Sequence, residues 1–93
     1  MTTSSGEAEV VDRPDENRLV VEADGEVAEL IYKREGNHLV LVHTGVPDAL
    51  AGRGIGGRLV KAAVEKAASE GLVVEAWCPF ARMWLRTHPE VAP

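Results

Sequence analysis

The chain changes its hydrophobic period once, at a glycine-rich loop, and this change limits the folds open to it. Residues 38–43 (His-Leu-Val-Leu-Val-His) form a nearly unbroken apolar run, which is typical of a central strand covered on both faces. After the loop at 51–57, apolar residues recur at helical spacing as far as Ala67, and Gly71 ends the pattern. A further apolar run follows at 72–77. This strand–helix–strand order predicts a right-handed crossover and a parallel pair of strands.

The segment before this unit predicts an antiparallel meander. Residues 18–23 and 26–33 are rich in apolar strand formers and flank Asp24-Gly25, a dipeptide that tolerates the positive φ angles of a tight hairpin. Glu35-Gly36-Asn37 marks the next turn. We therefore predict an α+β fold with an antiparallel meander at about 18–46, a crossover helix at about 55–70, a parallel strand at about 72–77 and a short C-terminal helix at about 80–87.

The first seventeen residues differ in character from the rest. Five acidic side chains against one arginine give residues 1–16 a local charge of −4, so the remainder carries −1 of the total of −5. Because this stretch shows no periodicity, we expect residues 1–17 to be a mobile acidic tail and residues 18–93 to form a single domain. Pairing of Val10 and Val11 with a sheet edge is the alternative. The stretch lacks the basic and apolar regions of a signal peptide.

Composition narrows the class of protein. With 93 residues, of which 45% are hydrophobic and 27% charged, the chain has room for one globular domain. An acidic chain does not favour nucleic-acid binding, and no apolar run approaches the roughly 20 residues of a membrane span. A single cysteine allows no internal disulfide, which fits the cytoplasm. The cysteine and histidines lack the spacing of metal ligands, so we expect no metal.

The stretch Gly-Arg-Gly-Ile-Gly-Gly at 52–57 predicts an anion site. A helix start leaves about four backbone N–H groups without helical partners, and glycines allow a phosphate to approach them. Arg53 and Arg58 could add positive charge. The loop is not a Walker motif, because Gly57 is followed by Arg58-Leu59 and not by Lys-Ser or Lys-Thr. The alternative is that the glycines only make a tight turn between strand and helix.

The loop also resembles that of a known family. Residues 52–60 (Gly-Arg-Gly-Ile-Gly-Gly-Arg-Leu-Val) after an apolar strand resemble the acetyl-coenzyme A loop of the GNAT superfamily of N-acetyltransferases. His-Thr-Gly-Val-Pro at 43–47 lies upstream, and Trp-Cys-Pro-Phe at 77–80 and His-Pro-Glu at 88–90 lie downstream. With these motifs the chain resembles the small YjdJ-type group of GNAT-like proteins, over roughly residues 18–90.

The resemblance implies an enzyme that transfers an acetyl group from acetyl-coenzyme A to an amine of a small molecule or peptide, as a monomer or weak homodimer. It implies that the pyrophosphate meets the loop and the pantetheine arm follows the strand end. The implied coenzyme-binding residues are Thr44, Gly45, Val46, Gly52, Arg53, Gly54, Ile55, Gly56, Gly57 and Arg58.

Two departures from the superfamily pattern favour an alternative function. The Arg or Gln that leads the superfamily loop falls on Ala51, and residues 80–85 contain no Tyr to act as a general acid. A non-catalytic coenzyme A-binding or regulatory module is therefore the alternative. A small protein-binding module that uses an exposed sheet edge is a third.

Cys78 and His43 are the candidate catalytic residues. Cys78 follows the last predicted strand, at the end where open α/β sheets place ligands, and its thiolate could accept an acetyl group. The resemblance adds the cysteine motif of the small group. His43 ends the central strand beside the implied thioester and could act as a base. The alternatives are a buried, inert cysteine and a histidine that only ends a strand.

Overall fold

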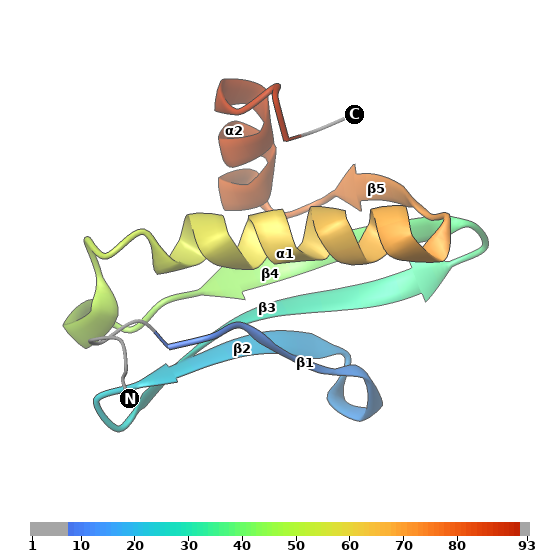
Figure 1. The fold of residues 1–93 in the computed structure, drawn as a ribbon. Coiled ribbons are helices and arrows are strands. Elements are labelled where there is room, and N and C mark those ends of the chain that lie inside the picture. Colours follow the sequence, from blue (N-terminus) through green and yellow to red (C-terminus); the bar gives the residue numbers. More distant parts are fainter. Residues whose placement is uncertain (1–7, 92–93) are drawn as a thin grey trace.

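The computed structural model describes residues 8–91, which form five strands and two α-helices (Figure 1). Short 3-10 turns follow β1 at Pro14–Glu16 and β4 at Asp48–Leu50. The elements are β1 (Val11–Arg13), β2 (Arg18–Ala23), β3 (Glu26–Glu35), β4 (His38–Gly45), α1 (Ile55–Glu70), β5 (Val73–Ala76) and α2 (Pro79–Thr87).

The strands form one sheet in the order β1-β2-β3-β4-β5. Neighbours are antiparallel from β1 to β4, and β4 and β5 are parallel, which confirms the predicted α+β fold and crossover. The turn between β2 and β3 has positive φ at both Asp24 and Gly25, as that dipeptide predicts. Helix α1 has the predicted bounds and ends at Gly71, which is left-handed.

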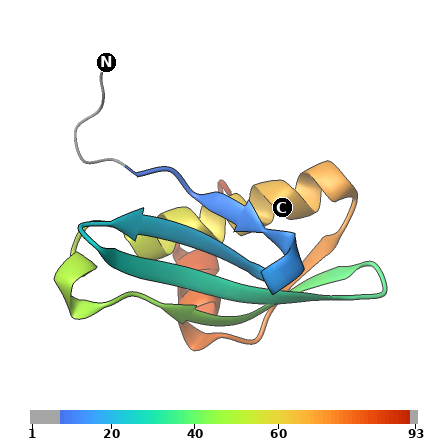
Figure 2. The ribbon, with the colours of Figure 1, turned by 90° about the horizontal axis from the view of Figure 1, so that it is seen from below.

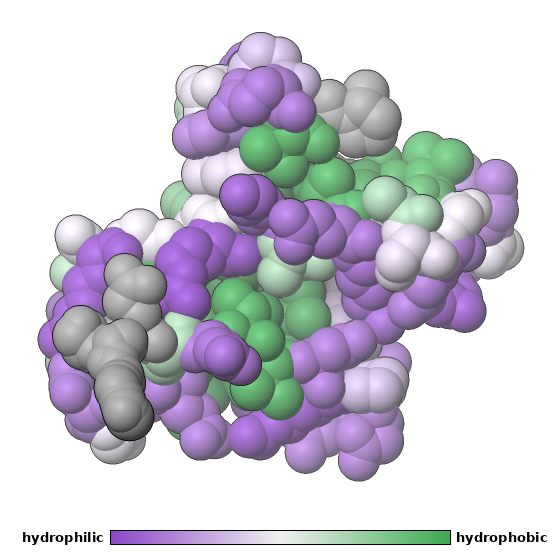
Figure 3. Space-filling view, viewed as in Figure 1, coloured by the Kyte–Doolittle hydropathy of each residue, from purple (hydrophilic) through white to green (hydrophobic). Residues whose placement is uncertain are grey.

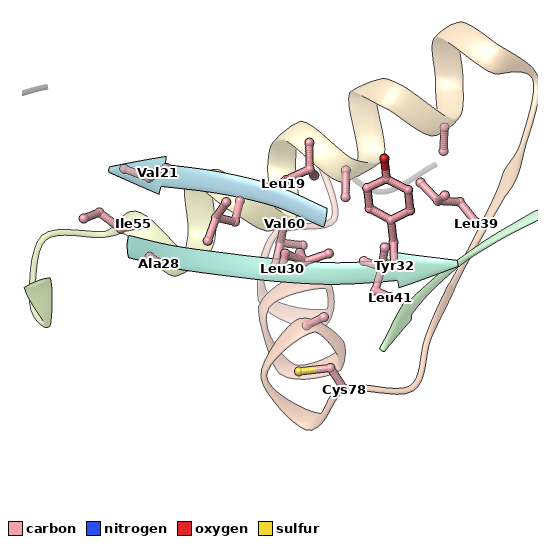
Figure 4. Close-up of a cluster of buried hydrophobic side chains, with 14 of the residues drawn as sticks. Leu19, Val21, Ala28, Leu30, Tyr32, Leu39, Leu41, Ile55, Val60 and Cys78 are labelled. Carbon is pink, nitrogen blue, oxygen red and sulfur yellow. The ribbon is translucent and has the colours of Figure 1, made fainter. Parts of the chain in front are cut away.

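Both helices lie on one side of the sheet. Figure 1 shows α1 running across that face, and Figure 2, seen from below, shows the sheet in front of both helices. The core between sheet and α1 is almost wholly aliphatic: Leu30, Leu41, Leu59 and Val60 are fully buried, and Tyr32 is its one aromatic member (Figure 4). Within residues 8–91 no helix covers the other face, which we call the open face.

The expectation of a mobile tail over residues 1–17 is wrong for its second half. Val11–Arg13 pairs with β2 as an edge strand, and Val10 packs against the core. Asp12 accepts a 2.6 Å hydrogen bond from the Tyr32 hydroxyl and a 2.8 Å contact from Lys66 Nζ. Strand pairing and a hydrogen bond to the buried Tyr32 therefore hold this segment. Residues 1–7 lie outside the described part of the chain.

A β-bulge divides β4 into two halves. Tyr32 of β3 pairs with Leu41, but its neighbour Ile31 pairs with His43, so Val42 is an extra residue. Before the bulge, Leu41 faces the core. After it, Thr44 pairs with the core residue Leu30 and faces the helices, whereas His43 faces the open side with Ile31. The bulge therefore turns Thr44, and not His43, toward the helices.

Candidate functional site

A cavity of about 360 Å³ lies between the loop that follows β4, the first turn of α1 and helix α2. Its walls are mostly apolar: Leu50 and Ile55 lie behind the loop, and Phe80 and Trp84 come from α2. Figure 3 shows apolar side chains gathered beside α2, where Phe80 and Met83 are exposed. The remaining lining residues are Val46, Ala51, Gly52, Gly54, Gly56 and Gly57.

The loop presents the start of α1 to this cavity. Gly52 and Gly54 have φ of 80° and 74°, a region that other residues rarely adopt, and a side chain added at either would meet no other atom within 4 Å. Gly54 is the N-cap and offers no side-chain cap, and the first helical hydrogen bond runs from Arg58 N–H to its carbonyl. The amides of Ile55, Gly56 and Gly57 therefore have no partner within the helix.

Gly56 and Gly57 serve a different purpose, because α2 packs against them. A Cβ on Gly56 would lie 2.8 Å from Phe80 Cζ, and one on Gly57 would overlap Trp84 Nε1. The two rings thus lie on the backbone of the first turn of α1. The tight-turn alternative from the sequence is correct in part: two glycines set the turn, and two make room for a helix.

The two loop arginines have partners outside the cavity lining. Arg53 pairs with Asp24 at the β2–β3 hairpin (2.8 Å) and donates to the Ala49 carbonyl (3.3 Å). Arg58 donates to the carbonyl of Ala8 in the N-terminal segment. In this arrangement the positive character of the cavity comes from backbone amides and the helix dipole and not from these side chains.

Cys78 lies at the N-cap of α2 and is 4% exposed. Its Sγ is 3.5 Å from Thr44 Oγ1, across the gap between β5 and β4. Burial raises the pKa of the thiol. Hydrogen bonds to the thiolate from the Ala81 backbone, the Thr44 hydroxyl and the backbones of Phe80 and Thr44 outweigh burial, so the pKa lies below its ordinary value.

The gap beside Cys78 opens where β4 and β5 separate. Their pairing ends at Leu41 and Ala76, and the backbone N–H groups of Trp77 and Cys78 both donate to the Leu41 carbonyl. Beyond that point β4 continues to Gly45 with β3 as its only strand partner among residues 8–91. The edge of Thr44, Gly45 and Val46 therefore runs from the thiol toward the cavity, since Val46 lines it.

The structure does not bring His43 to Cys78. His43 is exposed on the open face, whereas Cys78 belongs to the core cluster on the helix side. Simple alternation from Leu39 and Leu41 would place His43 inward, and the bulge at Val42 reverses this. The groups that lower the pKa of Cys78 are Thr44 and the start of α2, and not His43.

Comparison with known proteins gives the family. A family model described as GCN5-related N-acetyl-transferase matches residues 18–93. The chain belongs to this family. Its structure is similar to the NMR solution structure of a GCN5-like protein from Staphylococcus aureus, with a TM-score of 0.73 and 33% identity, covering 90% of this chain and 83% of that one. The GNAT resemblance found in the sequence is thus confirmed.

Among curated proteins, this GCN5-related chain is similar to protein NATD1. It is 38% identical over 63 residues to NATD1 of Gallus gallus, covering 67% of this chain and 57% of the relative, and equally identical to NATD1 of Homo sapiens, covering 67% and 56%. The chain thus spans a little over half the length of these relatives.

Residues 8–91 offer neither a metal-binding cluster nor a membrane-spanning helix. No three His, Cys, Asp or Glu side chains come together as a metal site. Neither helix combines the length and the apolar character needed to cross a membrane.

Sequence reasoning missed the contribution of α2 to the cavity. The sequence predicts only a short helix without a tyrosine over these residues, and the contact of Phe80 and Trp84 with Gly56 and Gly57 comes from the structure. The available signal was the i, i+4 spacing of two aromatic residues in a chain with few of them.

Proposed function

We propose that this member of the GCN5-related family is an acetyl-coenzyme A-dependent N-acetyltransferase acting on an amine of a small molecule or peptide. The observation that carries the proposal is one continuous path: the amides at the start of α1, the cavity, the free edge of β4 and the thiol of Cys78. We also propose that the chain belongs to the small YjdJ-type group.

The path matches the parts of the cosubstrate in order. A pyrophosphate suits the unpaired amides of Ile55, Gly56 and Gly57, where the helix dipole favours an anion. A pantetheine arm carries amides that can pair with the free backbone edge at Thr44, Gly45 and Val46, as an added strand would. The thioester would then lie near Cys78. Gly52 and Gly54 keep the entrance free of side chains.

Cys78 is the proposed nucleophile. Its thiolate sulfur would attack the acetyl carbonyl carbon, forming a new C–S bond while the C–S bond to coenzyme A breaks. Coenzyme A would leave as a thiolate and take a proton from water. The acceptor amine would then attack the acetyl-cysteine, lose a proton, and release Cys78 as the thiolate that the Thr44 hydroxyl and the start of α2 favour.

We still propose His43 as a base, acting independently of Cys78. Since its side chain lies on the open face, it can take a proton only from an amine that approaches from that side. Replacement by glutamine is expected to slow transfer and to leave coenzyme binding unchanged. Equal transfer rates in the wild type and His43→Gln would remove this role.

The loop assignment is tested at Gly54 and not at Gly56, because an aspartate at Gly56 would clash with Phe80. At Gly54 the space is open, and both Asp and Asn tolerate left-handed φ and cap helices well. Gly54→Asp places a carboxylate beside the phosphates, and Gly54→Asn is the matched neutral control. Calorimetry with coenzyme A should show weaker binding for Asp by 1 kcal/mol or more, roughly one charged hydrogen bond. Equal affinities for the two variants would contradict the loop assignment.

The covalent step is tested by mass spectrometry of the protein incubated with acetyl-coenzyme A. We expect a hydroxylamine-labile acetyl group on Cys78, and we expect Cys78→Ala to lose the adduct and the transfer to a panel of amines while still binding coenzyme A. Retained transfer by Cys78→Ala would mean direct attack by the amine. Binding without transfer to any amine would favour the non-catalytic coenzyme A-binding module.

For the cellular setting we propose a cytoplasmic protein that is a monomer or weak homodimer, uses no metal, and has neither nucleic acid nor membrane as a partner. A single cysteine, 4% exposed, suits a reducing compartment, where no disulfide is required. Fractionation of cells and sedimentation of the purified protein test these two points.

A further inference from the structure

Trp84 occupies an unusual position for an aromatic residue of a surface helix. Its indole nitrogen lies against the backbone of Gly57 in the first turn of α1, and its ring lines the cavity. His88 stacks on the indole ring, with centroids 3.9 Å apart and an interplanar angle of 10°. His88 Nδ1 is in turn 2.8 Å from the Trp84 carbonyl, which fixes the imidazole to the same turn of α2.

The two tryptophans differ in how their N–H groups are satisfied. The indole of Trp77 donates to Glu75 Oε2 at 2.7 Å and lies under the ammonium of Lys33. Among residues 8–91, the indole N–H of Trp84 has no such acceptor. A partly buried tryptophan N–H usually finds a partner, so the position of Trp84 leaves one donor available at the cavity wall.

The other polar groups at this wall are also donors. The amides of Ile55, Gly56 and Gly57 lack helical partners, and no side chain caps Gly54. One cavity therefore combines three backbone donors, a helix dipole and an indole N–H, and the lining contains no carboxylate. Such a set suits an acceptor that carries negative charge.

We propose that the indole N–H of Trp84 is a ligand-binding donor that hydrogen-bonds a phosphate oxygen in the cavity, alongside the amides of the first turn of α1. The inference rests on the proposed function, because it takes the ligand to be the pyrophosphate of coenzyme A. It adds a side chain of α2 to an anion site otherwise made of backbone. In this proposal His88 is a positioning residue, because its stack holds the indole in the orientation that binding requires.

The test compares Trp84→Phe with Trp77→Phe. Both keep a ring and remove an indole N–H, but only the first removes the free donor. Calorimetry uses coenzyme A, ADP (pyrophosphate without the arm) and pantetheine (arm without phosphate). We expect Trp84→Phe to weaken coenzyme A and ADP about tenfold or more, as for one hydrogen bond to a charged acceptor. We expect pantetheine binding to be unchanged, and Trp77→Phe to bind all three like the wild type.

A second measurement leaves Trp84 intact, so a folding defect in Trp84→Phe cannot obscure the result. Trp77→Phe has Trp84 as its sole tryptophan, and ADP should change the intensity or wavelength of its fluorescence. Equal ADP affinity in Trp84→Phe and the wild type, or unchanged Trp84 fluorescence at saturating ADP, would overturn the inference. Weakened pantetheine with unchanged ADP would also overturn it. If the wild type bound neither coenzyme A nor ADP, the proposed function itself would fail.

Discussion

Replacing Asp12 by alanine tests whether the N-terminal segment is part of the folded domain. Asp12 Oδ1 accepts the hydroxyl of Tyr32, which is 5% exposed, at 2.6 Å, and Oδ2 lies 2.8 Å from Lys66 Nζ. Leaving the tyrosine hydroxyl without a partner costs about 1–3 kcal/mol. Lys66 keeps a second partner, Glu70 at 2.8 Å, so the loss of its contact with Asp12 adds little to the loss of stability. We expect a loss of about 2 kcal/mol, which lowers the Tm of a chain this short by about 8–16 °C.

The assay is thermal and urea unfolding followed by circular dichroism. Asp15→Ala is the control, because it removes the same charge from the neighbouring 3-10 turn, where Asp15 makes no hydrogen bond to another described residue. A double-mutant cycle with Tyr32→Phe isolates the shared hydrogen bond: the double variant should lose clearly less than the sum of the single losses. Two results refute the reasoning: an Asp12→Ala loss no larger than that of Asp15→Ala, or strict additivity with Tyr32→Phe.

Three further predictions concern Tyr32, Cys78 and Gly57. Burial and the bond to Asp12 raise the pKa of Tyr32, so its stabilising contribution is complete below about pH 10, the pKa of an unfolded tyrosine, and is lost as pH rises further. Because Tyr32 is the only tyrosine, absorbance at alkaline pH should show it titrating above that value, and Tyr32→Phe should flatten the alkaline fall in stability. Iodoacetamide should begin to alkylate Cys78 at a lower pH than it does an ordinary thiol, whose pKa is near about 8.5, and coenzyme A should protect Cys78. Alkylation should begin at a higher pH in Thr44→Val than in Thr44→Ser, because only serine keeps the hydroxyl. The same starting pH in both variants would contradict the Thr44 contact. Gly57→Ala should lower stability by about 1–3 kcal/mol despite the better helix propensity of alanine, because Trp84 must move, and an increase in Tm would show that the ring yields freely.

Much of the fold could be predicted because local patterns and long-range packing agree. The period of α1 and its stop at Gly71 fixed both ends of the helix. Strand β1 could not be predicted in this way. It has three residues with no apolar alternation, and it is held by partners far along the chain, such as Tyr32 and Lys66. Only the tertiary structure shows those partners.

The site was predictable in composition but not in orientation. The glycine loop, the strand end and Cys78 lie along one path, as the spacing of the motifs indicated. The orientation of His43 was not predictable, since the sequence of β4 shows no sign that Val42 is extra to the pairing. The donors that face Cys78 also come from a neighbouring strand and a helix start, whose approach to one another is a property of the whole fold.

Because of the bulge at Val42, the alternation of inward and outward side chains along β4 shifts by one residue between its two halves. Residues up to Leu41 are constrained by the packing of the core, whereas those after Val42 are constrained by the gap beside β5, so each half can vary without disturbing the other. Deleting the single residue Val42 would restore regular pairing and keep both orientations, because His43 would then follow Leu41 onto the open side and Thr44 would still face the thiol. Regular pairing with Val42 kept in the strand would instead turn His43 inward, so a thiol beside a hydroxyl and a thiol beside an imidazole differ by a one-residue slip between β3 and β4.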